Sequence, residues 1–382
     1  MTRRVVIVVC DGLGVGAAPD AEAYGDAGSH TLAHVLDRHP TPLPNLERLG
    51  MLALAGRGTP KGARGKAFEL SAGKDTTTGH WEMMGLVTER PFPLYPDGFP
   101  PEVVTPFEER ARKKVLGNRP ASGTEIIREL GEEHMATGRP ILYTSGDSVF
   151  QVAAHEEVWP PEKLWELCRF ARGILKGEHL VGRVIARPFI GRAGAFTRTA
   201  NRRDFTVEPT GKTWLDFLVA AGKSVFGVGK IVDIFSGRGI TDSVHTGSDD
   251  EGMRVTTQAL RDHRADCVFT NLVDFDSKYG HRNDAAGYAR NLAALDALLP
   301  ELEAAATRDD LLLLTADHGC EATDVSTDHT REYVPLIAAG PAVRADADLG
   351  VRRGFCDLAA TAGEWLGVAA PRGESALAAI LR

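Results

Sequence analysis

Short apolar runs recur near both ends of the chain and predict strands that are buried on both faces. The first run, residues 5–9, is β-branched and does not alternate with polar residues, which is typical of a central strand in a parallel sheet. Similar runs occupy residues 224–228, 267–273, 311–315 and 334–339, and stretches with a helical pattern occupy residues 214–221, 284–306 and 357–366. This alternation predicts an α/β fold with a mostly parallel sheet covered by helices.

The middle of the chain has a different pattern. Prolines are dense between residues 91 and 106, and we expect neither a helix nor a central strand there. A helix (124–134), a strand (141–144), a second helix (160–175) and a second strand (183–188) follow, and residues 191–211 are irregular. The pattern predicts a discontinuous core domain, residues 1–92 and 208–382, interrupted by a smaller α+β cap domain, residues 93–207.

Composition narrows the range of partners. Lys and Arg number 44 against 52 Asp and Glu, and the resulting net charge of −8 disfavours binding to nucleic acid. The five cysteines are far apart and form no CxxC pair, which indicates a reducing cytoplasm rather than a disulfide framework. There is no run of about 20 apolar residues, so we expect no membrane span. A cytoplasmic protein with small-molecule partners is expected.

Acidic and imidazole side chains follow three of the predicted strands. In a parallel sheet the carboxyl ends of the strands share one edge, where ligands bind. The residues concerned are Asp11 after the first strand, Asp276 and His281 after the third, and Asp317, His318 and His329 after the fourth. We therefore expect these six side chains to share one edge of the sheet.

Several carboxylates in one cleft repel one another unless cations neutralise them. Asp and His without Cys favour Mn²⁺ or Mg²⁺, with Zn²⁺ as a further candidate. Six ligands suit two ions, and two such ions commonly hold the attacking and leaving oxygens of a phosphoryl transfer. Asp274 is excluded from the predicted ligands, because it points to the other face or supports the site from behind.

A polar segment with three consecutive threonines, residues 76–78, opens a predicted helix that runs through Met84. A helix N-terminus favours an anion such as phosphate, although an N-cap with a threonine cluster is the simpler interpretation. Coordination to a metal would make a threonine hydroxyl a competent nucleophile. The chemistry alone leaves open which of the three threonines reacts.

Residues 12–17 (GLGVGA) fit the glycine spacing of a dinucleotide-binding loop, so a dinucleotide-dependent oxidoreductase is an alternative function. Asp11 would place a negative charge beside the pyrophosphate, and Pro19 would interrupt the helix that must begin there. We therefore favour phosphoryl transfer.

The motifs together resemble one known family. Over nearly its whole length the chain resembles the prokaryotic-type phosphopentomutases of the alkaline phosphatase superfamily. The segments that carry the resemblance are residues 9–14 (VCDGLG), 73–82 (GKDTTTGHWE), 143–148 (YTSGDS), 186–189 (ARPF), 229–231 (GKI), 273–276 (VDFD) with His281, and 316–319 (ADHG) with His329. The metal motifs are shared across the superfamily, whereas residues 73–82 and the cap motifs are more particular to this family.

The resemblance implies an isomerase of nucleoside catabolism that interconverts α-D-ribose 1-phosphate and ribose 5-phosphate, and the 2-deoxyribose pair. It implies an alkaline-phosphatase-like core with an inserted cap. It also implies two Mn²⁺ ions, one held by Asp276, His281 and His329 and the other by Asp11, Asp317 and His318. Thr76 matches the phosphorylated nucleophile, primed by a sugar bisphosphate such as glucose 1,6-bisphosphate, and Thr77 stands where the family commonly has Met.

The cap is expected to bind the sugar phosphate. Arg187 suits the phosphate, because its guanidinium group can form two parallel hydrogen bonds to it, and Lys230 could also reach the phosphate. Ser145 and Asp147 could bind ribose hydroxyls. A phosphatase or phosphodiesterase of the same superfamily would share every metal ligand and is a second alternative function.

Overall fold

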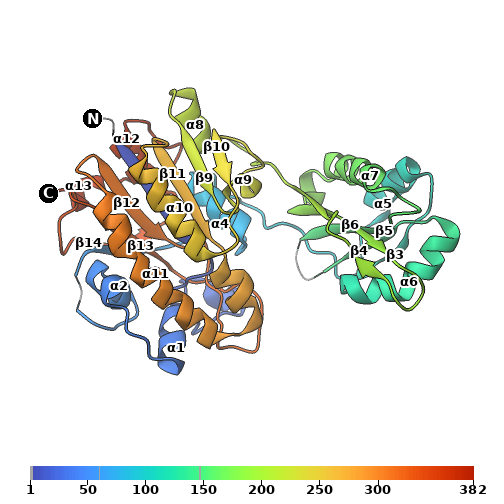
Figure 1. The fold of residues 1–382 in the computed structure, drawn as a ribbon, viewed down its shortest axis with the longest axis horizontal. Helices are drawn as coiled ribbons and strands as arrows, with labels where there is room; N and C mark the ends of the chain where they lie inside the picture. Colours follow the sequence, from blue (N-terminus) through green and yellow to red (C-terminus); the bar gives the residue numbers. More distant parts are fainter. Residues whose placement is uncertain (1–2, 60, 146–147) are drawn as a thin grey trace. The chain divides into compact units, whose positions relative to one another are not determined.

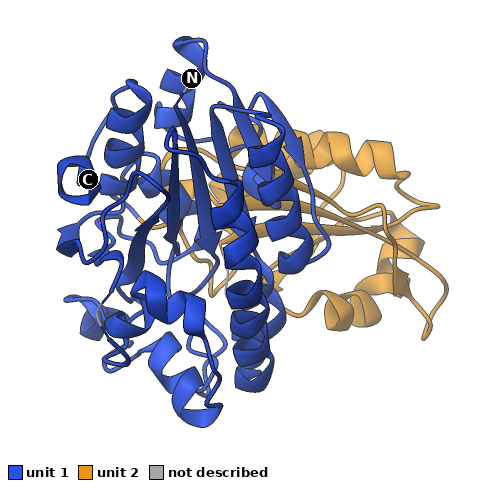
Figure 2. Cartoon of the chain, turned by 60° about the vertical axis from the view of Figure 1, so that its left-hand side comes forward, with its two compact units in different colours: residues 1–90, 208–382 blue, residues 91–207 orange. Residues whose placement is uncertain are grey.

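The computed structural model describes residues 3–59, 61–145 and 148–382. The chain divides into two compact units, shown in different colours in Figure 2. Unit 1 comprises Met1–Arg90 and Glu208–Arg382, and unit 2 comprises Pro91–Val207. Each unit has its own sheet and its own helices (Figure 1).

In the described part of unit 1, eight strands form one sheet in the order β10-β9-β11-β1-β12-β13-β2-β14. The strands are β1 (Arg4–Cys10), β2 (Ala63–Phe68), β9 (Val225–Val228), β10 (Asp242–Val244), β11 (Cys267–Leu272), β12 (Asp310–Thr315), β13 (Val334–Ala339) and β14 (Asp348–Arg353). Every residue of β1, β11 and β12 is buried, as the unbroken apolar runs predict. The α/β fold class predicted from the sequence is confirmed.

Helices of unit 1 cover these central strands. They are α1 (Thr31–Arg38), α2 (Pro44–Leu49), α3 (Met51–Leu54), α4 (Thr76–Met83), α8 (Trp214–Ala220), α9 (Ile231–Ile234), α10 (Asp249–Arg261), α11 (Ala285–Ala305), α12 (Asp357–Leu366) and α13 (Leu377–Ile380), with short helical turns over Ala21–Tyr24, Phe275–Tyr279 and Gly280–Arg282. Helix α10 packs against β11 and α11, and α12 packs against β1 and β12. None of the helices in the described residues is long and apolar enough to cross a membrane.

Strand direction decides which residues meet at one edge. Strand β1 is parallel to both neighbours, and Val9 pairs with Asn271 on one side and with Thr315 on the other. The carboxyl ends of β1, β11 and β12 therefore lie side by side, and the loops that follow them begin at the same edge. Strand β13 differs from its neighbours, because it runs antiparallel to both β12 and β2.

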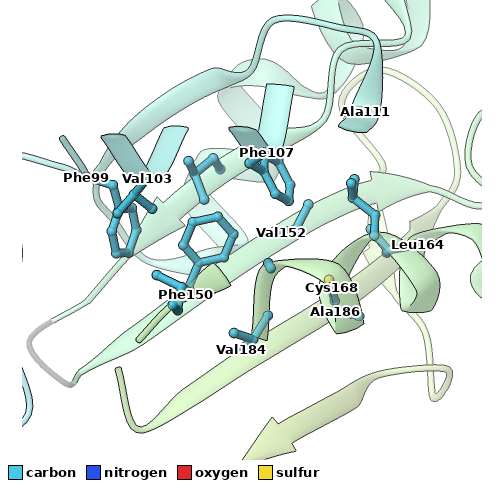
Figure 3. Packing of buried hydrophobic residues seen from close by; sticks show 14 of the residues in the cluster. Phe99, Val103, Phe107, Ala111, Phe150, Val152, Leu164, Cys168, Val184 and Ala186 are labelled. Atoms are coloured by element: carbon cyan, nitrogen blue, oxygen red, sulfur yellow. The ribbon is translucent and has the colours of Figure 1, made fainter. Parts of the chain in front are cut away.

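The sheet of unit 2 has the strand order β3-β4-β5-β6-β7 among the described residues, with β8 paired to β6. Its elements are α5 (Pro101–Ala111), β3 (Leu116–Pro120), α6 (Gly123–Thr137), β4 (Ile141–Thr144), β5 (Val149–His155), α7 (Pro161–Ile174), a turn over Gly177–His179, β6 (Arg183–Ile190), β7 (Thr197–Arg198) and β8 (Arg203–Thr206). Phe150, Val152 and Val184 belong to the larger of its two cores, which also includes residues of α5 and α7 (Figure 3). Ile141, Tyr143 and others form a second core with α6.

The prediction that the proline-rich stretch holds no helix is wrong. Helix α5 spans Pro101–Ala111, with Pro101 at its start and Pro106 inside it. A proline in the first turn sacrifices no hydrogen bond, because that N–H has no partner within the helix. Pro106 removes one bond, and the burial of Val103 and Phe107 against the rest of the core offsets that loss.

Candidate metal centre and nucleophile

The first cluster of candidate ligands joins the ends of β1 and β12. Asp11 follows β1 and is buried, and Asp317 and His318 follow β12 and are also buried. The Nε2 atom of His318 lies 3.3 Å from Asp11 Oδ1 and 3.4 Å from Asp317 Oδ2. One potential ligand atom from each residue lies within 4.8 Å of the others. The structure thus brings these three predicted ligands together.

The second cluster follows β11 and includes a residue from the loop before β13. Asp276 sits in the helical turn Phe275–Tyr279, and its Oδ1 lies 3.3 Å from His281 Nε2 and 3.4 Å from His329 Nε2. The two imidazole nitrogens are 3.1 Å apart. Backbone carbonyls fix the other side of each ring, because His281 Nδ1 contacts Thr327 O and His329 Nδ1 contacts Lys74 O. The second predicted ligand set is therefore also assembled.

The two clusters adjoin. The rings of His318 and His329 stack with their centroids 3.8 Å apart, and each ring belongs to a different cluster. The six side chains thus line one continuous centre at the carboxyl edge of the sheet. Asp274 lies outside it, and its carboxylate instead accepts from Lys278 Nζ and from the N–H of Asp249.

Whether cations fit this centre can be judged from three of its carboxylate oxygens, which lack hydrogen-bond partners among the described residues. Asp11 Oδ1, Asp276 Oδ1 and Asp317 Oδ2 are buried and accept no hydrogen bond from any residue that the structure describes. Burying an unpaired carboxylate oxygen is costly, and coordination to a cation removes that cost. The orphaned oxygens belong to the three aspartates of the two clusters, and oxygen and imidazole nitrogen are donors that suit Mn²⁺. The donor set therefore fits two divalent cations.

The pKa values of Asp11, Asp276 and His318 are shifted by their burial and by the charges of their neighbours. Burial and the neighbouring Asp317 raise the pKa of Asp11. Burial opposes ionisation of Asp276, yet the imidazoles of His281 and His329 hold its pKa well below its usual range. Burial also disfavours a charged His318, but Asp317 and Asp11 raise its pKa well above the usual value. Beyond the effect of burial, the pKa shifts of Asp11 and His318 both arise from the negative charge concentrated here, and divalent cations would neutralise that charge.

The three threonines are distinguished by their surroundings. Thr76 is the first residue of α4, and its Oγ1 lies 3.2 Å from His318 Nε2, at the metal centre. The Thr78 hydroxyl is engaged elsewhere, because it donates to the backbone and carboxylate oxygens of Asp75. Asp75 also accepts hydrogen bonds from the N–H groups of Thr77 and Thr78. These two N–H groups, which we expected to favour a phosphate at the helix N-terminus, are therefore already engaged. Of the three hydroxyls, that of Thr76 is the one beside the candidate ligands.

Three groups that the sequence analysis did not assign lie beside the aspartates, and two of them, Asn271 and the N–H of Gly12, donate to them. Asn271, the penultimate residue of β11, donates from Nδ2 to Asp11 Oδ2 at 2.8 Å. The N–H of Gly12 donates to Asp317 Oδ1 at 3.0 Å, and His80 Nδ1 lies 3.2 Å from Asp317 Oδ2 and 2.9 Å from Thr76 O. Groups of this kind fix which oxygen of a carboxylate faces a metal. His80 lies in the motif at residues 73–82, which is the signal that could have identified it.

Arg331 was also missed, and it fixes the segment that leads to Thr76. Its buried guanidinium donates to the carboxylate of Glu69 and to the carbonyls of Ser71 and Gly73, and it pairs with Asp20. Arg331 lies two residues after His329, so the same short segment supplies a candidate ligand and holds the loop that precedes Thr76. The sequence offers no periodic signal for such a residue, because its partners are spread over the chain.

The predicted sugar-binding residues lie in both units. Lys230 is exposed and follows β9 of unit 1. Arg187 lies in β6 of unit 2, where its Nε donates to Gln151 Oε1 at 2.8 Å, and Ser145 follows β4. Asp147 lies outside the described residues.

The glycine-rich loop after β1 lacks the helix that a dinucleotide site needs. No α-helix begins within residues 11–20, which the structure describes in full. Gly14 instead makes room for a buried carboxylate, because a Cβ there would lie 2.1 Å from Glu332 Oε2. That carboxylate accepts from Gly16 N and from the backbone and hydroxyl of Thr31. Gly14 therefore serves packing around Glu332.

Comparisons with known proteins agree with this geometry. The sequence model of the Metalloenzyme superfamily matches residues 3–370. A phosphopentomutase from Caldanaerobacter subterraneus subsp. tengcongensis is 56% identical over 95% of this chain and 94% of its own length. One from Carboxydothermus hydrogenoformans is 54% identical over 98% of each chain. A solved structure of a Pyrococcus horikoshii protein, 17% identical, shares the fold with a TM-score of 0.50 over 98% of this chain and 100% of that one. The chain therefore belongs to the phosphopentomutase family within the metalloenzyme, or alkaline phosphatase, superfamily.

Proposed function

We propose that this enzyme interconverts α-D-ribose 1-phosphate and ribose 5-phosphate, and the 2-deoxyribose pair, through a phosphorylated Thr76. The observation that carries the proposal is the position of the Thr76 hydroxyl, 3.2 Å from His318 Nε2 and beside a centre with three orphaned carboxylate oxygens. Membership of the phosphopentomutase family supports the same reaction.

Two Mn²⁺ ions are proposed, one held by Asp11, Asp317 and His318 and the other by Asp276, His281 and His329, as the two clusters suggest. When bound, they would supply the positive charge that lowers the pKa of a hydroxyl and stabilises a transferring phosphoryl group.

The residues of the chain then account for an isomerisation without net hydrolysis. Phosphorylated Thr76 gives its phosphoryl group to the free hydroxyl of the pentose phosphate: the bond from phosphorus to Thr76 Oγ1 breaks, a bond to the sugar oxygen forms, and that oxygen loses its proton. Thr76 Oγ1 then takes the other phosphate from the resulting 1,5-bisphosphate, and the sugar oxygen released regains a proton. A sugar bisphosphate such as glucose 1,6-bisphosphate would load Thr76 at the start.

Four side chains are proposed to bind the pentose phosphate. Arg187 and Lys230 would hold phosphate, and Ser145 and Asp147 would hold ribose hydroxyls. Arg187 is half-buried in unit 2 with Nε already fixed by Gln151, so its terminal nitrogens are oriented in advance for a bidentate contact. Unit 1 is proposed as the catalytic core and unit 2 as a cap that keeps water from the phosphorylated threonine.

The state of the cysteines bears on the cellular compartment that we propose. All five cysteines are free and buried, which suits a reducing compartment, and we place the enzyme in the cytoplasm with small sugar phosphates as its partners.

The test is conversion of ribose 1-phosphate to ribose 5-phosphate with Mn²⁺, with and without catalytic glucose 1,6-bisphosphate, while free phosphate is measured in the same reaction. We expect bisphosphate-stimulated conversion without release of phosphate. Thr76→Ala should abolish conversion, whereas the matched Thr77→Ala should retain it. Release of phosphate without isomerisation would instead identify a phosphatase of the same superfamily.

A further inference from the structure

A buried hydroxyl in unit 2 lacks a partner. Tyr143 lies in β4 and is fully buried, and its Oη atom forms no hydrogen bond with any of the described residues. Leaving a buried hydroxyl unpaired costs stability that a phenylalanine would not cost. A buried tyrosine hydroxyl of this kind points to a bound group that accepts its hydrogen bond.

The hydroxyl points at the start of a long helix. Gly123 is the first residue of α6, and a Cβ built on it would lie 2.6 Å from Tyr143 Oη and 3.7 Å from Arg187 Cδ. Glycine is therefore required there, because the Tyr143 hydroxyl lies where a Cβ would be, and the hydroxyl approaches the first turn of α6 closely. Ser122, the N-cap residue, forms no side-chain hydrogen bond to the N–H groups of that turn. These N–H groups and the helix dipole favour an anion.

The pairing of strands places basic groups on the same face. Gln151 of β5 is the cross-strand partner of Tyr143, and it also holds Arg187 Nε at 2.8 Å. Among the residues described, the terminal nitrogens of Arg187 donate to none. Burial raises the pKa of Tyr143 to about 12, and three arginines, Arg187, Arg198 and Arg202, lie close enough to oppose that rise. Asp204 is the acid at this face, and Arg202 pairs with it.

Apart from the exposed carboxylate of Glu125 in the same turn of α6, the polar groups here that lack partners among the described residues are donors. The groups are the hydroxyl of Tyr143, the terminal nitrogens of Arg187 and the first-turn N–H groups of α6. A ligand that satisfies them needs several acceptor oxygens on one centre and negative charge, and a phosphate monoester has both. A neutral ribose hydroxyl brings one oxygen and no charge.

We propose that Tyr143 and the first turn of α6 complete, with Arg187, the site for the phosphate that stays on the sugar while the other is transferred. This inference rests on the proposed function and adds to it a hydroxyl donor and a helix N-terminus. It assigns to Tyr143 a role in binding substrate, and to Gly123 the role of letting the hydroxyl approach the first turn of α6.

Tyr143→Phe distinguishes a role in binding substrate from a purely structural role, because the two roles predict different effects on kcat/KM and on the unfolding temperature. Because Tyr143 Oη has no partner among the described residues, its removal should leave the thermal unfolding temperature unchanged or raise it. It should nevertheless lower kcat/KM for ribose 5-phosphate by about tenfold to a hundredfold, since a hydrogen bond to a charged group is lost. The matched control is Tyr95→Phe in the same unit, whose hydroxyl bonds His179 Nδ1 at 2.8 Å. That control should lower the unfolding temperature and leave kcat/KM unchanged.

A second pair of variants tests the placement of the hydroxyl rather than its presence. Gly123→Ala should lower kcat/KM, because its Cβ would displace the Tyr143 hydroxyl from the first turn of α6. Gly173→Ala in α7, where a Cβ meets nothing within 4 Å, should not. If Tyr143→Phe and Gly123→Ala both retain the kcat/KM of an active wild-type enzyme, the inference is overturned and the proposed function stands. A wild-type enzyme that does not isomerise pentose phosphates would overturn the proposed function itself.

Discussion

Glu82 provides the most direct test of how helix α4, which begins at Thr76, is held. This residue of α4 is fully buried, and its carboxylate accepts hydrogen bonds from Leu70 N, Ser71 N, Ser71 Oγ and Phe355 N at 2.6 to 3.0 Å. The carboxylate thus ties the helix that begins at Thr76 to two separate segments of unit 1.

Glu82→Gln preserves the shape and replaces one acceptor by a donor. If the amide nitrogen takes the Oε1 position it faces Phe355 N, and if it takes the Oε2 position it faces Ser71 N. One buried N–H therefore loses its acceptor in either orientation, at about 1–3 kcal/mol, and the remaining bonds lose their charge. We expect a loss of about 3 kcal/mol, which for a unit of this size lowers the unfolding temperature by roughly 6–12 °C.

Calorimetry of the variant measures this shift. The control is Glu89→Gln, because Glu89 is exposed and its side chain has no hydrogen bond or ion pair among the described residues. Unfolding of Glu82→Gln at the wild-type temperature would show that the buried carboxylate does not hold α4, and the reasoning would be refuted.

Three further predictions concern the centre and its surroundings. Asn271→Leu removes the donor that orients Asp11 and should weaken Mn²⁺ binding by about 10- to 100-fold in a calorimetric titration; unchanged affinity would argue against that role. Burial raises the pKa of Asp249 from 3.8 to about 7. Between these pH values the folded chain keeps this proton and the unfolded chain loses it, so stability falls as the pH rises, by about 4 kcal/mol at most. Asp249→Asn should flatten that slope in unfolding measured across pH, and an unaltered slope would contradict the assignment. Chelation of divalent metal should abolish turnover and lower the unfolding temperature, because the buried carboxylates of Asp11, Asp276 and Asp317 then repel one another, and Mn²⁺ should restore both; a chelated enzyme of full stability would count against cation binding in this centre.

The apolar strands of unit 1 were predictable because burial on both faces leaves an unbroken run in the sequence. The predicted strand at residues 5–9 corresponds to β1 at Arg4–Cys10, and that at 311–315 corresponds to β12 at Asp310–Thr315. Strand β14 was missed, because most of its residues are exposed at the edge of the sheet and its sequence, DLGVRR, has no such run.

The candidate ligands were found because parallel strands end at one edge, which needs only the order of strands and loops. The supporting residues could not be found in this way. Arg331, Asn271 and His80 act through partners that are distant in the sequence, such as Glu69 at 262 residues and Asp11 at 260 residues. Such contacts depend on the packed structure, and only His80 lay within a motif that drew attention.

The unpaired hydroxyl of Tyr143 is a further feature that the sequence could not predict. In the sequence it is an aromatic residue in a short apolar strand, which indicates a core position, and the structure confirms that it is buried. Its unpaired hydroxyl becomes visible only once α6 and Gly123 are placed beside it.

The central claim is that Thr76 carries the phosphoryl group, and peptide mass spectrometry tests it most directly. The enzyme would be incubated with Mn²⁺ and glucose 1,6-bisphosphate, quenched in acid and digested, and the phosphate located within residues 74–82. The account predicts phosphate on Thr76, which persists while ribose 5-phosphate is turned over, because each cycle returns a phosphoryl group to this residue. Phosphate on Thr77 or Thr78, or an unmodified peptide from an enzyme that is turning over, would contradict it.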